Sequence, residues 1–430
     1  MALNSKQLEA YNLIAAGNNV FITGGGGVGK SHIIKAFIDE FEPRRYMGIT
    51  STTGISAILI GGTTLHSYLG IGLGKEDVPF LLRKIKRNKL KLKRWKSLET
   101  LIIDEISMLN PELFDKLEEI ARTLRRNKKP FGGIQLVLSG DFLQLPCINS
   151  DDFCFEAQSW NKCVTHTIYL KDLMRQSDTE FQECLNAIRI GKVEDKHKTY
   201  IEQCLGKKLQ TDDIIPTILY PKNYLVDDMN NSMLKKEIDK GYELYEYDMV
   251  IEKHPLKYTE KYTQPEFEEL KVEIEKEIDK IIKENVIPLK LQLCIGCQVM
   301  LLINLDVETG LVNGSKGKVI KIDEYGIPTV KFMNGMEVYV DFHDWEFKKE
   351  ETLFLTITQV PLKLGYSFSI HKSQGATLDL AEIDLSDIFE YGMAYVALSR
   401  VKDIDSLTIT NINWSKIRAH PKAVAYYETI

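Results

Sequence analysis

The stretch NNVFITGGGGVGKSHIIKAFIDEF, residues 18–41, decides the fold. Residues 20–23 have strong strand propensity, a glycine-rich turn follows, and the next residues have the apolar spacing of an amphipathic helix. The turn fits the pattern G-x-x-x-x-G-K-[ST], whose glycines let backbone N–H groups converge on phosphate oxygens at a helix N-terminus. The alternative is a glycine-rich turn that fits by chance. The sequence therefore predicts a phosphate-binding loop between a strand and a helix.

The residues of this loop have separate expected roles. Lys30 is expected to reach the β- and γ-phosphates of a nucleotide such as ATP, and Ser31 is expected to supply an oxygen to Mg²⁺. The nucleotide-binding residues predicted here are Gly24, Gly25, Gly26, Gly27, Val28, Gly29, Lys30 and Ser31.

A second segment, LETLIIDEISML at 98–109, ends a short apolar run with two carboxylates. Such a run is typical of a parallel strand that is buried on both faces. Asp104 at its end is expected to hold Mg²⁺, usually through water, and Glu105 to position and deprotonate an attacking water. The alternative is a pair of solvated carboxylates.

A third apolar segment, GIQLVLSGDFLQLP at 133–146, carries Asp141 and Gln144 at its end. A glutamine near the γ-phosphate can sense hydrolysis by hydrogen bonding. Three apolar strands that each end in polar groups place the chemistry at the carboxyl edge of one parallel sheet.

Length, charge and cysteine content set wider limits. A chain of 430 residues suggests two to four domains, and its net charge of −6 argues against coating nucleic acid by bulk electrostatics. The charge is uneven, since 83–96 is densely basic and 265–284 is mainly acidic. No apolar run reaches the length of a membrane span, and the N-terminus has no signal or transit peptide pattern.

The seven cysteines are scattered, which favours an intracellular, reducing compartment. Cys294 and Cys297 have CxxC spacing, but we expect buried thiols there rather than zinc ligands, because neither a second pair nor a histidine cluster accompanies them.

Several longer segments together resemble the Pif1-like DNA helicases of superfamily 1B, in the family's order and over nearly the whole chain. The departures are four consecutive glycines in the loop and a Lys/Glu-rich segment near 230–290. The matching segments include TSTTGISAILIGGTTLHSYLGIGLG (50–74), LIIDEISMLNPELFDKLEEIARTLRR (101–126), YLKDLMRQSDTEFQECLNAIRIGK (169–192), GCQVMLLINLDVETGLVNGSKGKV (296–319), SIHKSQGATL (369–378) and YVALSRV (395–401).

The resemblance implies an α/β fold with two RecA-like parallel-sheet P-loop domains, a small wedge insertion and an SH3-like β-barrel insertion. It places domain 1A at 1–168 with wedge 1B at about 65–97, domain 2A at 169–235 and 356–430, and inserted domain 2B at 236–355. Within 2B, short alternating segments between Asn-Gly and Tyr-Gly turns independently suggest a small barrel. Apolar residues between 267 and 281 recur at helical spacing, which predicts an acidic amphipathic helix near 264–286. We expect that helix to pack on the barrel or near the DNA, in a structural or partner role.

The resemblance also implies roles for single residues around the nucleotide. Arg400 would be an arginine finger, offered by the second RecA-like domain to the γ-phosphate, and Arg175 a second γ-phosphate arginine. Gln7 would read the edge of adenine, for which an amide offers donor and acceptor together. The alternatives are a solvated surface arginine, a structural arginine at a helix end and a solvated helix residue, respectively.

For single-stranded DNA, the resemblance implies contacts from both domains. Gln374 and Gly375 would couple the strand to the nucleotide, and the basic block 83–96 falls in the wedge. Hydroxyls near glycines also serve as turn and cap residues, and a basic block is often a solvated face, so both alternatives stay open. The expected DNA-binding residues are Thr52, Thr53 and His66 in the first domain and His371, Lys372 and Ser373 in the second.

These features together predict an ATP- and Mg²⁺-dependent DNA helicase that moves 5′→3′ along single-stranded DNA and unwinds forked duplex DNA. The polarity comes from the resemblance alone. We expect a monomer outside membranes, with replication or repair proteins as further partners. The alternatives are a translocase that displaces proteins or RNA–DNA hybrids, and a nucleotide-dependent binding module without turnover. The set Lys30, Asp104, Glu105, Gln144 and Arg400 argues against the second alternative.

Overall fold

The computed structural model divides the chain into two units that interleave along the sequence. Unit 1 comprises Met1–Met174, Tyr258–Asn285 and Ala419–Ile430, and unit 2 comprises Arg175–Lys257 and Val286–Arg418. None of the helices that the structure describes is long and apolar enough to cross a membrane. The described residues are 3–53, 56–57, 60–147, 150–176, 178–209, 214–256, 263–284, 287–306, 309–349, 352–375 and 377–430.

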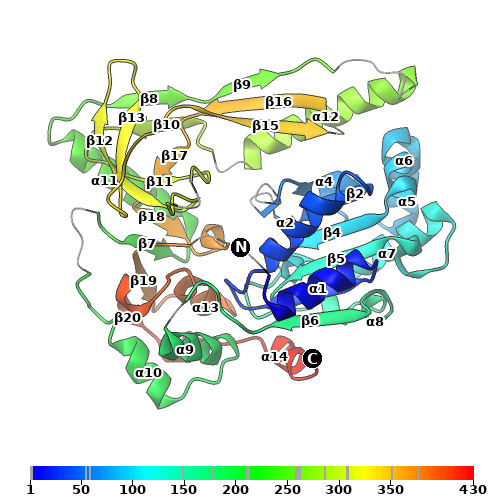
Figure 1. Ribbon diagram of the computed structural model, residues 1–430, viewed down its shortest axis with the longest axis horizontal. Coiled ribbons are helices and arrows are strands. Elements are labelled where there is room, and N and C mark those ends of the chain that lie inside the picture. The colour runs from blue at the N-terminus through cyan, green and yellow to red at the C-terminus, as the bar shows by residue number, and fades with distance from the viewer. Residues whose placement is uncertain are drawn as a thin grey trace. The chain divides into compact units, whose positions relative to one another are not determined.

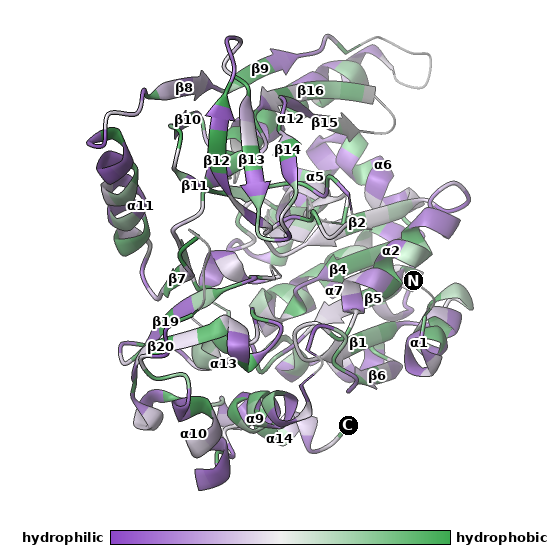
Figure 2. Cartoon of the chain, turned by 60° about the vertical axis from the view of Figure 1, so that its left-hand side comes forward, coloured by the Kyte–Doolittle hydropathy of each residue, from purple (hydrophilic) through white to green (hydrophobic). Residues whose placement is uncertain are grey.

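The parallel sheet predicted from the three apolar segments forms the centre of unit 1 (Figure 1). Its strand order is β3-β2-β4-β5-β1-β6, and all neighbouring pairs are parallel. The strands that carry the three segments are buried throughout, and Figure 2 shows their hydrophobic colouring. The strand bounds are β1 Val20–Gly24, β2 Met47–Ser51, β3 Thr63–Thr64, β4 Thr100–Asp104, β5 Gln135–Gly140 and β6 His166–Leu170.

Helices cover this sheet and begin at residues that the sequence marks as caps. Asn4 and Gln7 form a reciprocal capping box at the first helix, and Asn110 caps α7 just before a proline. The first-unit helices that precede unit 2 in the sequence are α1 Ser5–Ala15, α2 Lys30–Phe41, α4 Leu65–Leu69, α5 Val78–Arg87, α6 Lys89–Ser97, α7 Pro111–Arg125 and α8 Trp160–Cys163.

Unit 2 has a second parallel sheet, with strand order β18-β7-β19-β20. Its alternating burial pattern in β7 and β19 contrasts with the fully buried strands of unit 1. The elements are β7 Thr217–Tyr220, β18 Ser367–Ser369, β19 Ala381–Leu385 and β20 Leu407–Ile412, with helices α9 Thr179–Arg189, α10 Asp195–Glu202, α11 Asn223–Ile238 and α13 Met393–Leu398.

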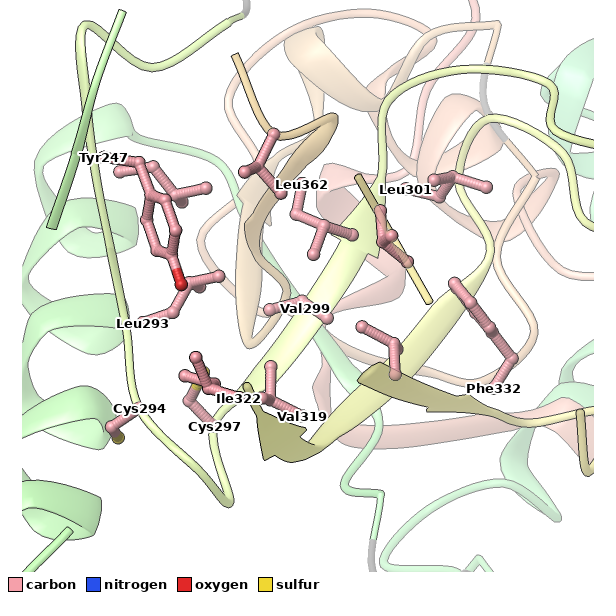
Figure 3. Packing of buried hydrophobic residues seen from close by; sticks show 14 of the residues in the cluster. Tyr247, Leu293, Cys294, Cys297, Val299, Leu301, Val319, Ile322, Phe332 and Leu362 are labelled. Atoms are coloured by element: carbon pink, nitrogen blue, oxygen red, sulfur yellow. The ribbon is translucent and has the colours of Figure 1, made fainter. Parts of the chain in front are cut away.

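The predicted strand-and-turn region of unit 2 is an antiparallel sheet with order β14-β13-β12-β11-β17. Figure 3 shows its core, where Val299, Val319, Phe332 and Leu362 meet from four strands. Cys294 and Cys297 belong to the same core and are fully buried free thiols. The strands are β11 Gln298–Leu301, β12 Lys316–Ile322, β13 Pro328–Phe332, β14 Glu337–Tyr339 and β17 Leu362–Leu364.

Two smaller antiparallel sheets complete unit 2, a pair β10-β8 and a triple β15-β16-β9. In the sequence, β9 precedes the acidic helix predicted near 264–286 and β10 follows it. The bounds are β8 Tyr245–Asp248, β9 Val250–Lys253, β10 Lys290–Leu293, β15 His343–Lys349 and β16 Thr352–Gln359.

Two helices from distant parts of the sequence join unit 1. The predicted acidic helix is confirmed as α12 Gln264–Glu284, and it packs against α6. Its buried residues are Phe267, Leu270, Ile274 and Ile278, so the predicted apolar face is the face that packs. The second is α14, Pro421–Tyr427, whose last tyrosine packs on Tyr169 of β6 at a centroid distance of 5.6 Å.

Candidate nucleotide and DNA sites

The glycine-rich loop follows β1 and leads directly into α2, as predicted. Gly24 has φ +143° and Gly29 has φ +87°, a region that L side chains rarely adopt. A Cβ atom on Gly24 would lie 2.3 Å from the carbonyl oxygen of Leu170, and one on Gly29 would lie 2.4 Å from Nε2 of Gln7. Both glycines are therefore required by the backbone conformation and by close neighbours.

Lys30 and Ser31 open helix α2, where backbone N–H groups are available to an anion. The Nζ of Lys30 donates to the carbonyl oxygens of Gly24 and Gly25 at 2.7 and 2.9 Å, so its ammonium group lies over the loop. The Ser31 side chain is exposed at the second position of the helix. This donor set fits a nucleotide phosphate.

Gln7 lies beside the loop but its amide is engaged with the protein. Its Nε2 donates to the Val28 carbonyl at 3.0 Å, and its Oε1 accepts from the backbone N–H of Asn4 at 3.0 Å. The side chain is 2% exposed, which excludes the simple alternative of a solvated helix residue. Its predicted role in reading adenine stays a prediction.

Asp104 is the last residue of β4, and Glu105 follows it at the carboxyl edge of the sheet. Burial raises the pKa of the Asp104 carboxyl, and the nearby Lys30 ammonium opposes that shift. Glu105 has φ +54° and ψ +45°, an uncommon conformation for a residue without a glycine's freedom. Strained backbone of this kind concentrates at functional sites.

Replacing Glu105 with glutamine is expected to leave ATP binding intact and to lower ATP turnover by about a hundredfold or more, because an amide cannot accept the proton of an attacking water. Nucleotide affinity and steady-state phosphate release measure the two effects. Glu99→Gln, an exposed position just before β4, is the matched control. Loss of ATP binding in Glu105→Gln would instead assign this residue a structural role.

The segment after β5 brings Gln144 to the same edge of the sheet. Gln144 is 5% exposed, and its backbone N–H donates to the Asp141 carbonyl at 3.1 Å. The carboxylate of Asp141 is fully buried and accepts from the backbone N–H of Leu143 at 3.1 Å. Asp141 therefore shapes the turn that presents Gln144.

The predicted DNA-binding threonines of unit 1 also form hydrogen bonds within the protein. The Thr52 hydroxyl donates to the Glu105 carbonyl at 2.7 Å, and the Thr53 hydroxyl donates to Ser56 at 2.9 Å. Thr53 also accepts from the Ser56 backbone N–H, as a helix cap does. His66 lies on α4 and is half-buried. The contact of Thr52 with Glu105 links the predicted DNA segment directly to the predicted catalytic base.

The basic block 83–96 divides into two groups. Arg94 and Trp95 are buried and bind the backbone of α4, through Arg94 Nη1 to the Tyr68 carbonyl at 2.6 Å and Trp95 Nε1 to the Leu69 carbonyl at 3.0 Å. These two residues hold α6 in place. The exposed basic side chains of α5 are Arg83, Lys84, Lys86 and Arg87.

Within unit 2, the predicted arginines Arg400 and Arg175 both contact Ser399. Arg400, 1% exposed, follows α13, and its guanidinium donates to the Val396 carbonyl at 2.8 Å and to the Ser373 carbonyl at 3.2 Å. Arg175 Nη1 donates to the Ser399 carbonyl at 2.8 Å. These contacts join three separate predicted motifs and exclude the alternative of a solvated arginine at 400.

The remaining predicted residues of unit 2 lie close by in the sequence motif around 371–375. His371 Nε2 lies 3.2 Å from Oε2 of Glu390, and Lys372 is exposed. Ser373 is buried, and its hydroxyl donates to the Ile370 carbonyl at 2.8 Å. Gly375 has φ +82°, which favours glycine.

Sequence reasoning missed one residue of the unit 1 site, Tyr427. Its buried hydroxyl contacts Thr23, immediately before the glycine-rich loop, and Asp141, immediately before Gln144. A tyrosine in a short helix far from every motif carries no local signal for such a contact.

Comparisons with known proteins identify the family of the chain. The model of the family described as PIF1-like helicase matches residues 2–199, and that described as the 2B domain of DNA helicase Pif1 matches residues 278–322. The ATP-dependent DNA helicase PIF1 of Danio rerio is 36% identical over all of this chain, which spans 64% of that protein's length.

Two solved structures extend the comparison over the whole chain. Pif1 helicase from Candida albicans is 35% identical, with TM-score 0.76 and coverage of 100% of this chain and 99% of that one. Bacteroides Pif1 in complex with ADP-AlF3 and ssDNA is 28% identical, with TM-score 0.65 and coverage of 100% and 97%. These matches confirm the predicted α/β fold class with its SH3-like insertion. The chain belongs to the PIF1-like helicase family.

Proposed function

We propose that this protein is a helicase that uses ATP and Mg²⁺ to move 5′→3′ along single-stranded DNA and to unwind duplex DNA. The observation that carries the proposal is that the Lys30 ammonium of the phosphate-binding loop lies near Asp104 at the end of β4, while Gln144 follows β5, the strand between β4 and β1. Each of these groups has a distinct task in phosphoryl transfer.

In this proposal the loop binds the phosphates and the acidic residues serve the attacking water. Lys30 and the N-terminus of α2 hold the phosphates, while Ser31 and Asp104 hold Mg²⁺. Bound Mg²⁺ supplies charge neutralisation at the β- and γ-phosphates. Glu105 orients the water and takes its proton, Gln144 senses the γ-phosphate, and Arg400 with Arg175 stabilises transition-state charge.

The DNA part of the proposal rests on residues in both units. Thr52, Thr53 and His66 of unit 1 and His371, Lys372 and Ser373 of unit 2 are proposed to contact single-stranded DNA, with Gly375 coupling that contact to the nucleotide. The exposed lysines and arginines of α5 suit the phosphates of a fork. The complex of Bacteroides Pif1 with ssDNA supports this substrate class.

All seven cysteines are free thiols, which supports a reducing, intracellular compartment. We propose that the protein acts as a monomer, with replication or repair proteins as further partners.

Two partial duplexes test the polarity, one with a 5′ single-stranded tail and one with a 3′ tail. Under single-turnover conditions with ATP and Mg²⁺, unwinding is expected to require the 5′ tail. A 3′-tailed duplex that is unwound equally well refutes the polarity. A failure to release phosphate in the presence of single-stranded DNA refutes the proposed function as a whole.

A further inference from the structure

We propose that Tyr427 is a positioning residue that fixes the Gln144 turn relative to the phosphate-binding loop. The inference rests on the proposed function, because it gives a task to a group outside all the motifs of that site. Tyr427 ends α14, which belongs to unit 1 although it follows unit 2 in the sequence (Figure 1).

The Tyr427 hydroxyl joins the ends of two neighbouring strands. It donates to Asp141 Oδ1 at 3.1 Å, accepts from the Phe142 backbone N–H at 3.2 Å and contacts the Thr23 hydroxyl. Thr23 is the residue before Gly24, and strands β1 and β5 pair side by side. One oxygen atom therefore connects the start of the phosphate-binding loop to the start of the Gln144 turn.

The donors and acceptors of this network can be assigned consistently. A phenol has one hydrogen to donate, and the Asp141 carboxylate can only accept while it is ionised. The Tyr427 hydrogen then goes to Asp141, and the Phe142 N–H donates to the phenol oxygen. The Thr23 hydroxyl donates its hydrogen to the Gly140 carbonyl at 2.8 Å and contacts the phenol oxygen. Such charge-assisted bonds to a buried carboxylate are short-range and directional, as a positioning contact requires.

The rest of α14 is fastened to the same part of unit 1, so the hydroxyl is held in place. The Tyr426 ring stacks on Phe155 with centroids 4.2 Å apart and an interplanar angle of 9°. Lys422 Nζ lies 2.5 Å from Asp152 Oδ1 and 3.0 Å from Glu156 Oε1. These contacts anchor the helix independently of the Tyr427 hydroxyl, which makes removal of that hydroxyl alone a clean test.

The test compares Tyr427→Phe with wild type in the full chain, by DNA-stimulated ATP turnover, KM for ATP and Tm. We expect kcat to fall severalfold with KM little changed and Tm only modestly lowered, because the ring and its packing remain while the buried Asp141 carboxylate loses a donor. Tyr426→Phe, which removes a hydroxyl from the neighbouring residue of α14, is the control and should keep wild-type kcat. A loss confined to Tm, or an equal loss of kcat in both variants, overturns the proposal.

A double-mutant comparison shows whether Tyr427 acts through Gln144. If it does, Tyr427→Phe should lower kcat in the wild-type background but add nothing to Gln144→Ala. Additive losses refute the coupling. A wild-type kcat in Gln144→Ala refutes the role proposed for Gln144, and the coupling with it, whereas a slow Gln144→Ala beside an unaffected Tyr427→Phe refutes the coupling alone.

The acidic helix α12 carries a second, independent inference: we infer that it competes with nucleic acid for the basic helices α5 and α6. Residues 78–97 contain nine lysines and arginines and no acidic residue, whereas α12 contains eight acidic residues and four lysines. Helix α12 packs against α6, and α6 contacts α5, to whose exposed basic side chains the proposed function assigns DNA phosphates.

One contact places α12 at the predicted DNA segment of unit 1. The Thr63 hydroxyl donates to Glu277 Oε1 at 3.3 Å, and Thr63 lies in β3, three residues before His66. A carboxylate at this position repels a phosphate that approaches the same hydroxyl. The inference rests on the proposed DNA binding, and it assigns α12 the role of an internal brake on that binding.

Glu277→Gln removes this charge while keeping a hydrogen-bond acceptor for Thr63. Binding of a fluorescent oligo-dT without nucleotide should tighten by about threefold at low salt, with the difference vanishing at high salt. Glu268→Gln is the matched control, because Glu268 is exposed and pairs with Lys271 of its own helix at 2.9 Å. Equal changes in both variants, or none, overturn the inference. A wild-type chain that binds no oligo-dT refutes the proposed DNA binding and this competition together.

Discussion

Lys30→Ala should lower DNA-stimulated ATP turnover by at least about a hundredfold, as expected when a preorganised positive group is removed from developing phosphate charge. In the structure the lysine ammonium lies against the carbonyls of Gly24 and Gly25, within the phosphate-binding loop. Binding of single-stranded DNA without nucleotide should therefore remain close to wild type. Phosphate release and oligonucleotide affinity measure the two expectations.

Lys35→Ala provides the control for this substitution, because Lys35 is exposed and lies on the same helix. It should keep wild-type turnover. Undiminished DNA-stimulated hydrolysis in Lys30→Ala would contradict the assignment of the phosphate-binding loop.

Arg400→Ala should lower kcat by roughly 10³–10⁵, the range for an arginine that stabilises transition-state charge in phosphoryl transfer. ATP affinity should stay within about tenfold of wild type, since such a group acts mainly in the transition state. Single-turnover hydrolysis and equilibrium nucleotide binding separate these two quantities.

Arg400→Ala is also expected to destabilise the fold. Arg400 is buried and donates to the Val396 and Ser373 carbonyls, so alanine leaves acceptors without their partner at a cost of about 1–3 kcal/mol. Turnover must therefore be compared among variants whose folding has been checked by Tm. Arg400→Lys keeps the charge but not the planar fork and should also be slow. The exposed Lys402→Ala is the control, and an unchanged kcat in Arg400→Ala would leave this residue with a structural role only.

Much of the architecture around the nucleotide could be predicted from local sequence. The apolar runs before the glycine-rich loop, Asp104 and Asp141 each form a buried strand of one parallel sheet, because such runs suit strands that are covered on both faces. The acidic helix was predictable for a similar reason, since its apolar residues recur at helical spacing. The domain boundaries stay a prediction.

Local sequence could not reveal which residues far apart in the chain contact each other in the fold. No sequence pattern around Tyr427 predicts that its hydroxyl contacts Asp141. The two residues are 286 positions apart, and only the three-dimensional packing brings them together. The left-handed conformation of Glu105 was equally hidden, since glutamate has no preference for it. Arg94 and Trp95 look like part of a DNA-binding block in the sequence, whereas both bind the backbone of α4.

The late position of α14 has a consequence for biosynthesis. Thr23 and Tyr427 are 404 positions apart, and at 5–20 residues per second a ribosome needs about 20 to 80 seconds to pass from one to the other. All six strands of the first sheet are made early in that interval, so the sheet can form while unit 2 is still being translated. We expect the Gln144 turn to acquire its final hydrogen-bond partner only after α14 has left the ribosome. Synthesis of α14, rather than formation of the sheet, would then determine when a nascent chain becomes a competent ATPase.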